Sequence, residues 1–386
     1  MVRFADGVSG LSNIVEVPLV AHVVLRFDYG GLENGLVNLI NHMPPSCARH
    51  VVIGLTEVSE ISSRIERDDV EIYAVHKKPG KDPSAYYRLF TLLRRLRPDI
   101  VHTRNIGTLD CQVVARLAGV RRTVHSEHGW DTTDHEGRSR KYRLLRRLVS
   151  VLVDRHVALS RELESWLVED LGVPRSKVSR ICNGVDTTRF VPAPKVARGP
   201  SVVIGTVTRF SDIKDPLNTL RAFVRLRTSV GSKRALRLIM VGDGPLLETV
   251  RREALDAGVG DDVCLPGSQL DVTPWLRRMD LFVMGSRREG ISNTILEAMA
   301  SGLAVVATRT GGNLELIDDG KTGALVPPQS ADALADAMRP YVLDDALRVG
   351  HGAAGRARVI SEFSLDAMVR QYAALYAWSS QRRRAA

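Results

Sequence analysis

A strand–helix alternation that runs along the chain, stops and then starts again is the feature that most constrains the fold. Short runs rich in β-branched residues are separated by longer stretches whose apolar residues recur at three- and four-residue spacing, as in amphipathic helices. Such an alternation predicts a parallel sheet with helical crossovers. In the first half we expect strands at residues 22–27, 51–55, 70–75, 99–102 and 122–126, and helices at residues 32–43, 84–97 and 107–118.

The alternation stops at residues 190–200, which hold three prolines and have no apolar periodicity. We therefore expect two Rossmann-like, doubly wound α/β domains, residues 1–190 and 201–364, joined by a linker at residues 191–200. A last helix within residues 365–386 follows the second sheet, and we expect it to pack back on the first domain. In the second half the expected strands are residues 202–207, 236–241, 263–265, 281–284 and 304–308, and the expected helices are residues 216–228, 246–257 and 293–300.

Composition narrows the class of protein. A chain of 386 residues with 44% hydrophobic and 25% charged residues is long enough for two cores and unlike disordered, collagenous or coiled-coil chains. It shows neither a leader-like segment nor an apolar window of about 18 residues, so we expect a cytoplasmic protein. No C-x-x-C pair occurs, which argues against a thiolate metal site and favours a reducing compartment for the four cysteines, Cys47, Cys111, Cys182 and Cys264.

The net charge of +10 is spread evenly, with about +5 on each side of residue 190. An even distribution argues against a nucleic-acid-binding tail, whereas a basic surface attracts anions such as sugar nucleotides or acidic lipids. Residues 138–153 combine a basic first half with an apolar second half. They predict either a helix on an anionic membrane surface or a core helix with a solvated basic face. The cations of this segment are Arg138, Arg140, Lys141, Arg143, Arg146 and Arg147.

Strand-to-helix loops are the expected places for a site, because ligands of open parallel sheets lie beyond the carboxyl ends of the strands. The first loop carries Gly30 and Gly31 directly before a helix, where a phosphate or sugar can approach free N–H groups. The alternative is a tight turn without a ligand. His128 follows the expected strand 122–126 and would face a cleft between the domains. His102 ends the preceding strand similarly, and a structural histidine is the alternative.

The second domain begins with two cations on one loop, Arg209 and Lys214. A planar guanidinium and a mobile ammonium suit a pyrophosphate, and two solvated surface cations are the alternative. The next loop, around Asp243, resembles half of a dinucleotide fingerprint. Leu247 stands where that fingerprint needs its third glycine, which weakens an NAD-binding interpretation.

Two glutamates give the strongest signal. Glu289 precedes a helix that Ser292 or Asn293 can cap, and Glu297 lies about one turn into it, so both can border one pocket. Carboxylates accept hydrogen bonds from sugar hydroxyls, and the N–H groups at the helix start suit an anion. The pair could therefore hold a hexose and a ribose at opposite ends of a diphosphate. The alternative is one surface acid and one acid on a helix face.

The segment EGISNTILEAMASGLAVVATRTGG resembles the donor-site signature of retaining glycosyltransferases of family 4, group 1 type, which have the GT-B fold. GTVTRFSDIKD is similar to their phosphate-binding loop, and VGDGP and CNGVDTTRF also recur in them. The stretches FDYGGLENGLVNLIN and VHSEHGWDTTDHEGRSRKYR look most like bacterial sugar transferases of exopolysaccharide assembly. The resemblance covers nearly the whole chain. It implies transfer of a hexose from a nucleotide-diphosphate sugar to a glycan or lipid-linked acceptor.

The resemblance also implies roles for individual residues. Glu297 would bind the donor ribose and Glu289 the transferred sugar, while Arg209 and Lys214 would hold the diphosphate. His128 would contact the sugar near its reacting carbon. Thr208 and Ser292 replace a frequent glycine and a frequent proline, which removes no side chain with an assigned role. The other implied donor contacts are Gly30, Gly31, Asp243, Leu270, Ile291, Ser292, Asn293 and Thr294.

Several competing functions are excluded. Asp319 to Thr322 imitate the end of a P-loop, but Glu315 stands where its earlier glycine is required. The chain has no D-x-D pair, so we expect a metal-independent transferase with no cofactor, and no nucleic-acid partner. If residues 138–153 bind a membrane, the protein would be peripheral on its inner face. Two alternatives remain: a sugar-nucleotide 2-epimerase of the same fold, and a non-catalytic protein that binds nucleotide sugars or other anions.

Overall fold

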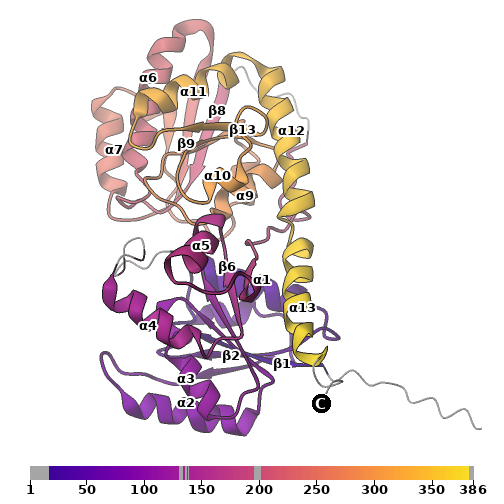
Figure 1. Cartoon of the computed structure of the whole chain (residues 1–386). Coiled ribbons are helices and arrows are strands. Elements are labelled where there is room, and N and C mark those ends of the chain that lie inside the picture. The colour runs from indigo at the N-terminus through magenta and orange to yellow at the C-terminus, as the bar shows by residue number, and fades with distance from the viewer. Residues whose placement is uncertain (1–16, 130–133, 135–136, 138, 195–200, 382–386) are drawn as a thin grey trace, which may run out of the picture.

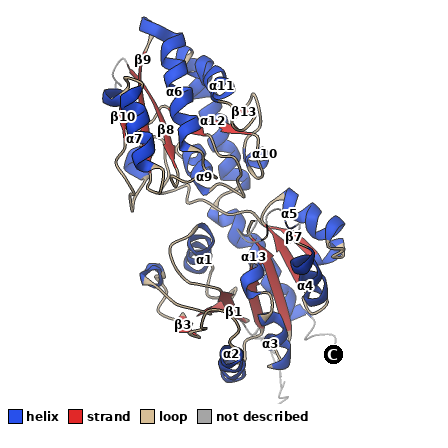
Figure 2. Cartoon of the chain, turned by 90° about the vertical axis from the view of Figure 1, so that its left-hand side faces the viewer, coloured by secondary structure: helices blue, strands red, loops and turns tan. Residues whose placement is uncertain are grey.

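Two α/β domains form the protein (Figure 1). The computed structural model describes residues 17–129, 134, 137, 139–194 and 201–381. Each domain has one parallel sheet with helices on both faces (Figure 2). This arrangement confirms the predicted fold class of two doubly wound parallel sheets. Most of the predicted linker, residues 195–200, lies outside the described residues.

The first domain contains a seven-stranded parallel sheet in the order β3-β2-β1-β4-β5-β6-β7. The order reverses at β1, and the loops after β1 and β4 therefore open at a crevice beyond the carboxyl ends of the strands. The strands are β1 (Leu19–Val24), β2 (Arg49–Gly54), β3 (Glu71–Ala74), β4 (Ile100–Arg104), β5 (Arg122–Glu127), β6 (Arg155–Ala158) and β7 (Val178–Arg180).

Helices from both ends of the chain cover this sheet. One face packs on α1 (Gly31–His42) and on the last helix, α13 (Leu365–Gln381), which returns from the second domain (Figure 1). The other face packs on α2 (Pro83–Leu96) and α3 (Cys111–Leu117). Two further helices, α4 (Arg140–Ser150) and α5 (Arg161–Ser165), follow β5 and β6.

The second sheet repeats the topology of the first with one strand fewer, in the order β10-β9-β8-β11-β12-β13. Its strands are β8 (Ser201–Val207), β9 (Ala235–Val241), β10 (Val263–Cys264), β11 (Leu281–Met284), β12 (Ala304–Thr308) and β13 (Gly323–Val326). Its helices are α6 (Pro216–Val230), α7 (Leu247–Asp256), α8 (Thr273–Leu276), α9 (Asn293–Ala300), α10 (Asn313–Leu316), α11 (Ala331–Leu343) and α12 (Asp345–Glu362). Within the described part of the chain, no helix is long and apolar enough to cross a membrane.

The expected and observed elements differ where the chain makes short turns. The helix expected at residues 107–118 begins only at Cys111, because residues Ile106–Thr108 form a 3-10 turn after Asn105. The strands β6, β7 and β13 were not expected from the sequence. Each has only three or four residues, too few to show a period in the sequence.

Polar side chains occupy the interior of the first domain. On the face covered by α13, His22 Nε2 lies 2.9 Å from His50 Nδ1, and His102 Nδ1 lies 2.9 Å from the hydroxyl of Tyr376. Arg104 Nη2 lies 3.1 Å from His22 Nδ1. All five side chains are buried. The sheet of the second domain packs in two apolar clusters, one of which also includes residues of the first domain between Ala158 and Phe190.

Candidate active site

A cavity of about 550 Å³ lies between the two domains, at the carboxyl ends of both sheets. One wall comes from the first domain, at the start of α1 and the ends of β4 and β5. The other comes from the loops after β8 and β11 and from the start of α9. The structure brings most of the predicted site residues together here: Gly31, His128, Arg209, Lys214, Leu270, Glu289, Ile291, Ser292, Asn293, Thr294 and Glu297.

Two predicted residues do not line this cavity. Gly30 directly precedes α1, and its carbonyl accepts a hydrogen bond from Asn34 N within the first turn. Asp243 is exposed, and its carboxylate accepts a hydrogen bond from the N–H of Gly244. Its carbonyl accepts from Phe210 N at 2.9 Å, so its loop packs directly beside the loop of Arg209. Roles for Gly30 and Asp243 in donor binding stay predictions.

An ion pair joins the two loops of the second domain. Lys214 Nζ lies 2.7 Å from both carboxylate oxygens of Glu289, and Ser286 Oγ donates to the same carboxylate at 2.6 Å. Glu289 is nearly buried, whereas Lys214 is partly exposed to the cavity. The arrangement places one carboxylate and one ammonium side by side, where they can bind a sugar hydroxyl and a phosphate oxygen at neighbouring positions.

Close backbone packing fixes the loop of Glu289. Gly311 has φ +45, and a Cβ atom at this position would lie 1.8 Å from the carbonyl oxygen of Glu289. Any side chain there would force the two loops apart. The next residue, Gly312, donates its N–H to the carbonyl of Gly290 at 3.0 Å. The glycines that follow β12 thus determine where Glu289 stands.

The start of α9 faces the first domain across the cavity. Ser292 Oγ accepts a hydrogen bond from Ile295 N and thereby caps the start of α9. The other N–H groups of the first turn have no partner within the helix and face the cavity. Asn293 Oδ1 accepts from Asn183 Nδ2 at 2.8 Å, a contact between the domains. On the other side, a Cβ atom at Gly31 would lie only 3.6 Å from Asn293 Nδ2. An anionic group held here would touch both domains.

Glu297 lies on the wall of the cavity, one turn into α9. Burial raises its pKa to about 7, although the positive charge of Arg189 opposes the shift and Asp271 adds to it. The Arg189 and Asp271 side chains pair with each other at 2.8 Å beside this wall. Glu297 therefore changes its charge near neutral pH, and its ability to accept hydrogen bonds from hydroxyl groups changes with it.

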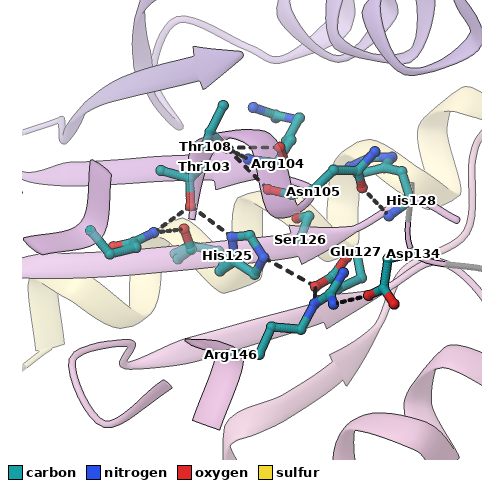
Figure 3. Close-up of polar contacts among 12 residues, drawn as sticks. Thr103, Arg104, Asn105, Thr108, His125, Ser126, Glu127, His128, Asp134 and Arg146 are labelled. Carbon is teal, nitrogen blue, oxygen red and sulfur yellow. Dashed lines mark hydrogen bonds and ion pairs between the residues drawn. The ribbon is translucent and has the colours of Figure 1, made fainter. Parts of the chain in front are cut away.

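His128 projects from the end of β5 into the same cavity (Figure 3). Both ring nitrogens are buried, and neither has a hydrogen-bond partner among the residues that the structure describes. Burial, helped by the charge of Arg104, lowers the pKa of His128 to about 3. The ring is thus neutral at physiological pH, with one donor and one acceptor available to a ligand.

The side chains behind His128 form a buried ionic cluster (Figure 3). Arg146 Nε lies 2.8 Å from Glu127, and Arg146 Nη1 lies 2.5 Å from Asp134. The guanidinium also stacks over the ring of Trp166, at 5.0 Å from its centroid. Burial would raise the pKa of Glu127, but His125 and Arg146 lower it to about 2.

Arg146 therefore corrects the interpretation of the basic segment. The sequence predicts it among the cations of a membrane-facing or solvated surface, but it points inward and its side chain is only 5% exposed. The reason is that two carboxylates and an aromatic ring, which lie outside the segment, compensate its charge. Arg138 belongs to the same predicted group and lies outside the described residues.

Sequence reasoning missed several residues of the first-domain wall. Asn34, Asn38, Arg64, Asn105 and Asn183 all line the cavity. Arg64 comes from the turn Glu60–Arg64, and its Nη1 donates to Asn34 Oδ1 at 2.5 Å. Asn34, Asn38 and Asn183 lie within stretches quoted for the family resemblance, but none was singled out, because an amide alone indicates no particular chemistry. Asn105 and Arg64 lie in no such stretch. Among the described residues, no group of three His, Cys, Asp or Glu side chains is arranged to hold a metal ion.

Comparisons with known proteins identify the family of the chain. The model of the family "Glycosyltransferase Family 4" matches residues 29–189, and that of "Glycosyl transferases group 1" matches residues 201–344. A Mycobacterium tuberculosis GDP-mannose-dependent alpha-(1-6)-phosphatidylinositol monomannoside mannosyltransferase is 31% identical over 282 residues, which cover 67% of this chain and 70% of the relative. An Escherichia coli UDP-Gal:alpha-D-GlcNAc-diphosphoundecaprenol alpha-1,3-galactosyltransferase is 28% identical over 284 residues, 70% of this chain and 73% of that protein.

Solved structures share the fold. Anabaena HepE in complex with UDP superposes with a TM-score of 0.80 at 18% identity, covering 93% of this chain and 99% of that one. A glycosyltransferase from Rickettsia africae gives the same TM-score at 20% identity, covering 94% and 99%. The two facing domains thus have the GT-B architecture, and the two family matches identify the chain as a glycosyltransferase. More particularly, the chain belongs to the group 1 glycosyltransferases of family 4.

Proposed function

We propose that the protein transfers a hexose from a nucleotide-diphosphate sugar to an acceptor hydroxyl, with retention at the anomeric carbon. The observation that carries the proposal is the grouping of Lys214, Glu289 and Glu297 around the start of α9, in one cavity with His128. The names of two relatives specify GDP-mannose and UDP-Gal as donors, and HepE was crystallised with UDP and with UDP-glucose. Retention is proposed from the resemblance of the two-glutamate motif.

The cations and helix amides would act on the leaving group. As the glycosidic bond breaks, negative charge grows on the diphosphate, and Arg209, Lys214 and the N–H groups of α9 would stabilise it. His128 is neutral, so it would bind the sugar by a hydrogen bond rather than as a charge. Glu289 would accept hydrogen bonds from the sugar and Glu297 from the ribose. Each side chain would thereby hold a different part of the donor.

The activity is proposed to be independent of metal ions and of any cofactor. Arg209, together with Lys214 once a donor competes for it with Glu289, would supply positive charge to the diphosphate, the task that a divalent cation performs elsewhere. We expect turnover to change by no more than a factor of about two after dialysis against EDTA. Removal of a group that stabilises the developing charge would instead lower turnover by about 10²-fold or more. Abolition by EDTA with rescue by manganese would contradict this expectation.

The test of the function is a transfer assay. The protein would be incubated with radiolabelled GDP-mannose, UDP-glucose or UDP-galactose, with and without lipid-linked and soluble acceptors, and the configuration of the product determined by NMR. Acceptor-dependent release of nucleoside diphosphate with an α-linked product is the expected result. Conversion of the donor without acceptor would favour a sugar-nucleotide 2-epimerase. Binding of nucleotide without turnover would favour a non-catalytic protein.

We further propose that the acceptor is a lipid-linked or surface glycan of bacterial envelope synthesis, and that the protein works in the cytoplasm at an anionic membrane surface. The names of the mycobacterial and E. coli relatives describe lipid-linked acceptors. In this chain, α4 and the residue that ends it expose the apolar side chains Leu144, Leu148 and Val151 on one stripe. Besides the buried Arg146, α4 carries the cations Arg140, Lys141, Arg143 and Arg147. Of these, Arg143 and Arg147 donate to Asp170.

An amphipathic helix of this kind can lie in a membrane interface with its cations among the headgroups, each contributing about 1 kcal/mol near an anionic surface. Co-sedimentation with vesicles of phosphatidylglycerol and phosphatidylcholine tests this. We expect replacement of Arg140, Lys141, Arg143 and Arg147 by glutamine to abolish binding. The matched control replaces Arg221, Arg225, Arg251 and Arg252, which are exposed on α6 and α7, and should leave binding intact. Equal effects of the two sets would mean that only net charge matters.

A further inference from the structure

Asn105 has an unusual backbone conformation at the end of β4. Its φ is +58 and its ψ is 171, in a region that glycine adopts readily and other residues rarely do. Asparagine does not favour this backbone conformation by itself, so the surrounding contacts must impose it. Residues in such conformations are concentrated at functional sites.

The turn is fixed from both sides. Asn105 N donates to the carbonyl of Ser126 on β5 at 2.8 Å, which extends the pairing of the two strands. Thr108 Oγ1 accepts from Arg104 N at 2.8 Å and donates to Arg104 O at 2.7 Å, and it is fully buried. These bonds set the backbone of Asn105 before its side chain makes any contact.

The side chain then reaches across to the neighbouring strand end. Asn105 Oδ1 accepts a hydrogen bond from the backbone N–H of His128 at 2.7 Å (Figure 3). His128 is the first residue after β5, so its N–H no longer takes part in the sheet. The next residue, Gly129, has φ +147. Because glycine has no Cβ atom, it restrains the backbone beside His128 very little. The hydrogen bond from Asn105 therefore fixes the peptide plane from which the His128 ring projects.

The ring of His128 makes no hydrogen bond of its own within the described residues. Its orientation in the cavity thus depends on its backbone and on packing. Asn105 also lines the cavity, directly beside His128. The two residues come from adjacent strand ends, and 22 residues of sequence lie between them.

We propose that Asn105 is a positioning residue for His128, held in a glycine-like conformation so that its carboxamide oxygen can fix the His128 peptide. This inference rests on the proposed function, in which His128 contacts the donor sugar. A near-attack geometry tolerates little displacement, and a misplacement of about 1 Å can cost about 10²-fold in rate. A small rotation of an unsupported His128 peptide would move the ring nitrogens by a comparable distance.

Glycine and aspartate at position 105 separate the backbone from the side chain. Asn105→Gly accepts the observed φ and ψ without strain and removes only the carboxamide. Asn105→Asp keeps an oxygen acceptor at the same place. We expect Asn105→Gly to lower kcat by about 10- to 100-fold, with little change in KM for the donor or in melting temperature. Asn105→Asp should keep most of the wild-type kcat.

Hydrogen exchange gives a readout that does not depend on activity. The His128 amide, followed by mass spectrometry with electron-transfer fragmentation, should exchange faster in Asn105→Gly than in the wild type and should stay protected in Asn105→Asp. An unchanged exchange rate in Asn105→Gly would overturn the inference, because the hydrogen bond would then not hold the peptide. Faster exchange in Asn105→Asp would overturn it as well.

A double-variant cycle separates this inference from the proposed function. If Asn105 acts through His128, then Asn105→Gly should add nothing to the loss seen in His128→Ala. Additive losses would overturn the inference alone, because Asn105 would then contact substrate independently. A wild-type rate in Asn105→Gly together with a slow His128→Ala would do the same. A wild-type rate in His128→Ala would instead overturn the role of His128 in the proposed function.

Discussion

The two domains have the same strand order over six strands, yet their interiors differ in kind. The first domain buries His22, His50, His102, His125 and His156 on the strands of its sheet, and the second buries no histidine among its described residues. The second domain keeps its ion pairs at loops and helix surfaces, as with Lys214 and Glu289. The first carries an ion pair inside, between Arg146 and Glu127.

The difference teaches that the same topology can support a site in two ways. In the second domain an apolar core supports charged loops, so a charge at the cavity can be removed without loss of fold. In the first domain the groups that support the cavity are part of the core. Stability and function should therefore respond together in the first domain and separately in the second, and each of the following experiments tests that statement.

Acidification should produce the largest difference. Burial lowers the pKa of His22 and His102 well below 6.5, and lowers the pKa of His50 and His156 to about 3. These rings stay neutral when folded but become protonated when unfolded, so stability is full above about pH 6.5 and is lost as pH falls. Between pH 7.5 and 5.5 each histidine should lower the free energy of unfolding by about 1.4 kcal/mol, thus by up to about 5.6 kcal/mol for the four together.

The measurement is urea unfolding at both pH values, with pulsed hydrogen exchange that follows peptides of β4 and β5 separately from those of β11 and β12. We expect the first domain to unfold at much lower urea at pH 5.5, and the second to change little. A parallel loss in both domains would contradict the distinction between their interiors.

Removing one arginine from each domain should give the next largest difference. Arg146→Met leaves Glu127 and Asp134 buried without their cation, which should cost about 3–5 kcal/mol. The matched variant is Arg225→Met in α6, which breaks the ion pair with Asp332. The side chains of Arg225 and Asp332 are 48% and 74% exposed, so the free energy of unfolding should fall by less than about 1 kcal/mol. Urea midpoints with unchanged m-values provide the comparison. Equal losses in the free energy of unfolding would show that burial does not determine how much these ion pairs contribute to stability.

Arg209→Ala tests whether the charged loops of the second domain are independent of its core. Arg209 is exposed at the cavity, so we expect an unchanged melting temperature and turnover reduced by about 10²- to 10³-fold, the usual effect of losing a group that stabilises developing charge. Arg252→Ala, at an exposed position of α7 outside the cavity, should change neither quantity. A large drop in melting temperature for Arg209→Ala would assign the residue a structural role.

Glu297→Gln should give the smallest effect and sharpens the comparison by pH. With a pKa of about 7, Glu297 becomes ionised as pH rises from 6 to 8, and the ionised form is the better acceptor for ribose hydroxyls. Nucleotide affinity of the wild type should therefore increase over this range. The variant should bind about 1–3 kcal/mol more weakly at pH 8 and lose the pH dependence. Calorimetry with UDP and GDP measures both, and an unchanged affinity would exclude the ribose contact.

Much of this architecture was predictable because the relevant signals are local. The helix α9 and the strands β11 and β12 have the bounds expected from the sequence, since Ser292 caps the helix and the strands are continuous apolar runs. The two glutamates could be placed on one pocket for the same reason, because a loop and one helical turn determine their spacing. The parallel sheets followed from the alternation of strands and helices.

The parts that could not be predicted depend on contacts between distant residues. Nothing in the sequence around Arg146 indicates that Asp134 and Trp166 will surround its guanidinium, so its six-cation segment looked uniformly solvated. Asn105 gave no signal because a positive φ on a non-glycine residue is imposed by Ser126 and Thr108 rather than by local preference. His22, His50 and His102 likewise look like alternating polar residues in the sequence, which does not show that α13 will cover them.

The return of α13 has a consequence for how the chain is made. Tyr376 fills the first domain's core and lies within hydrogen-bonding distance of His102, a residue 274 positions earlier. The ribosome releases the second domain, including α12, before it releases α13. During synthesis, the domain that emerges first is therefore the last to be completed, and its sheet must wait with His22 and His102 uncovered while the second domain folds. Closing so long a loop is slow, and we expect the nascent first domain to depend on chaperones more than its neighbour does.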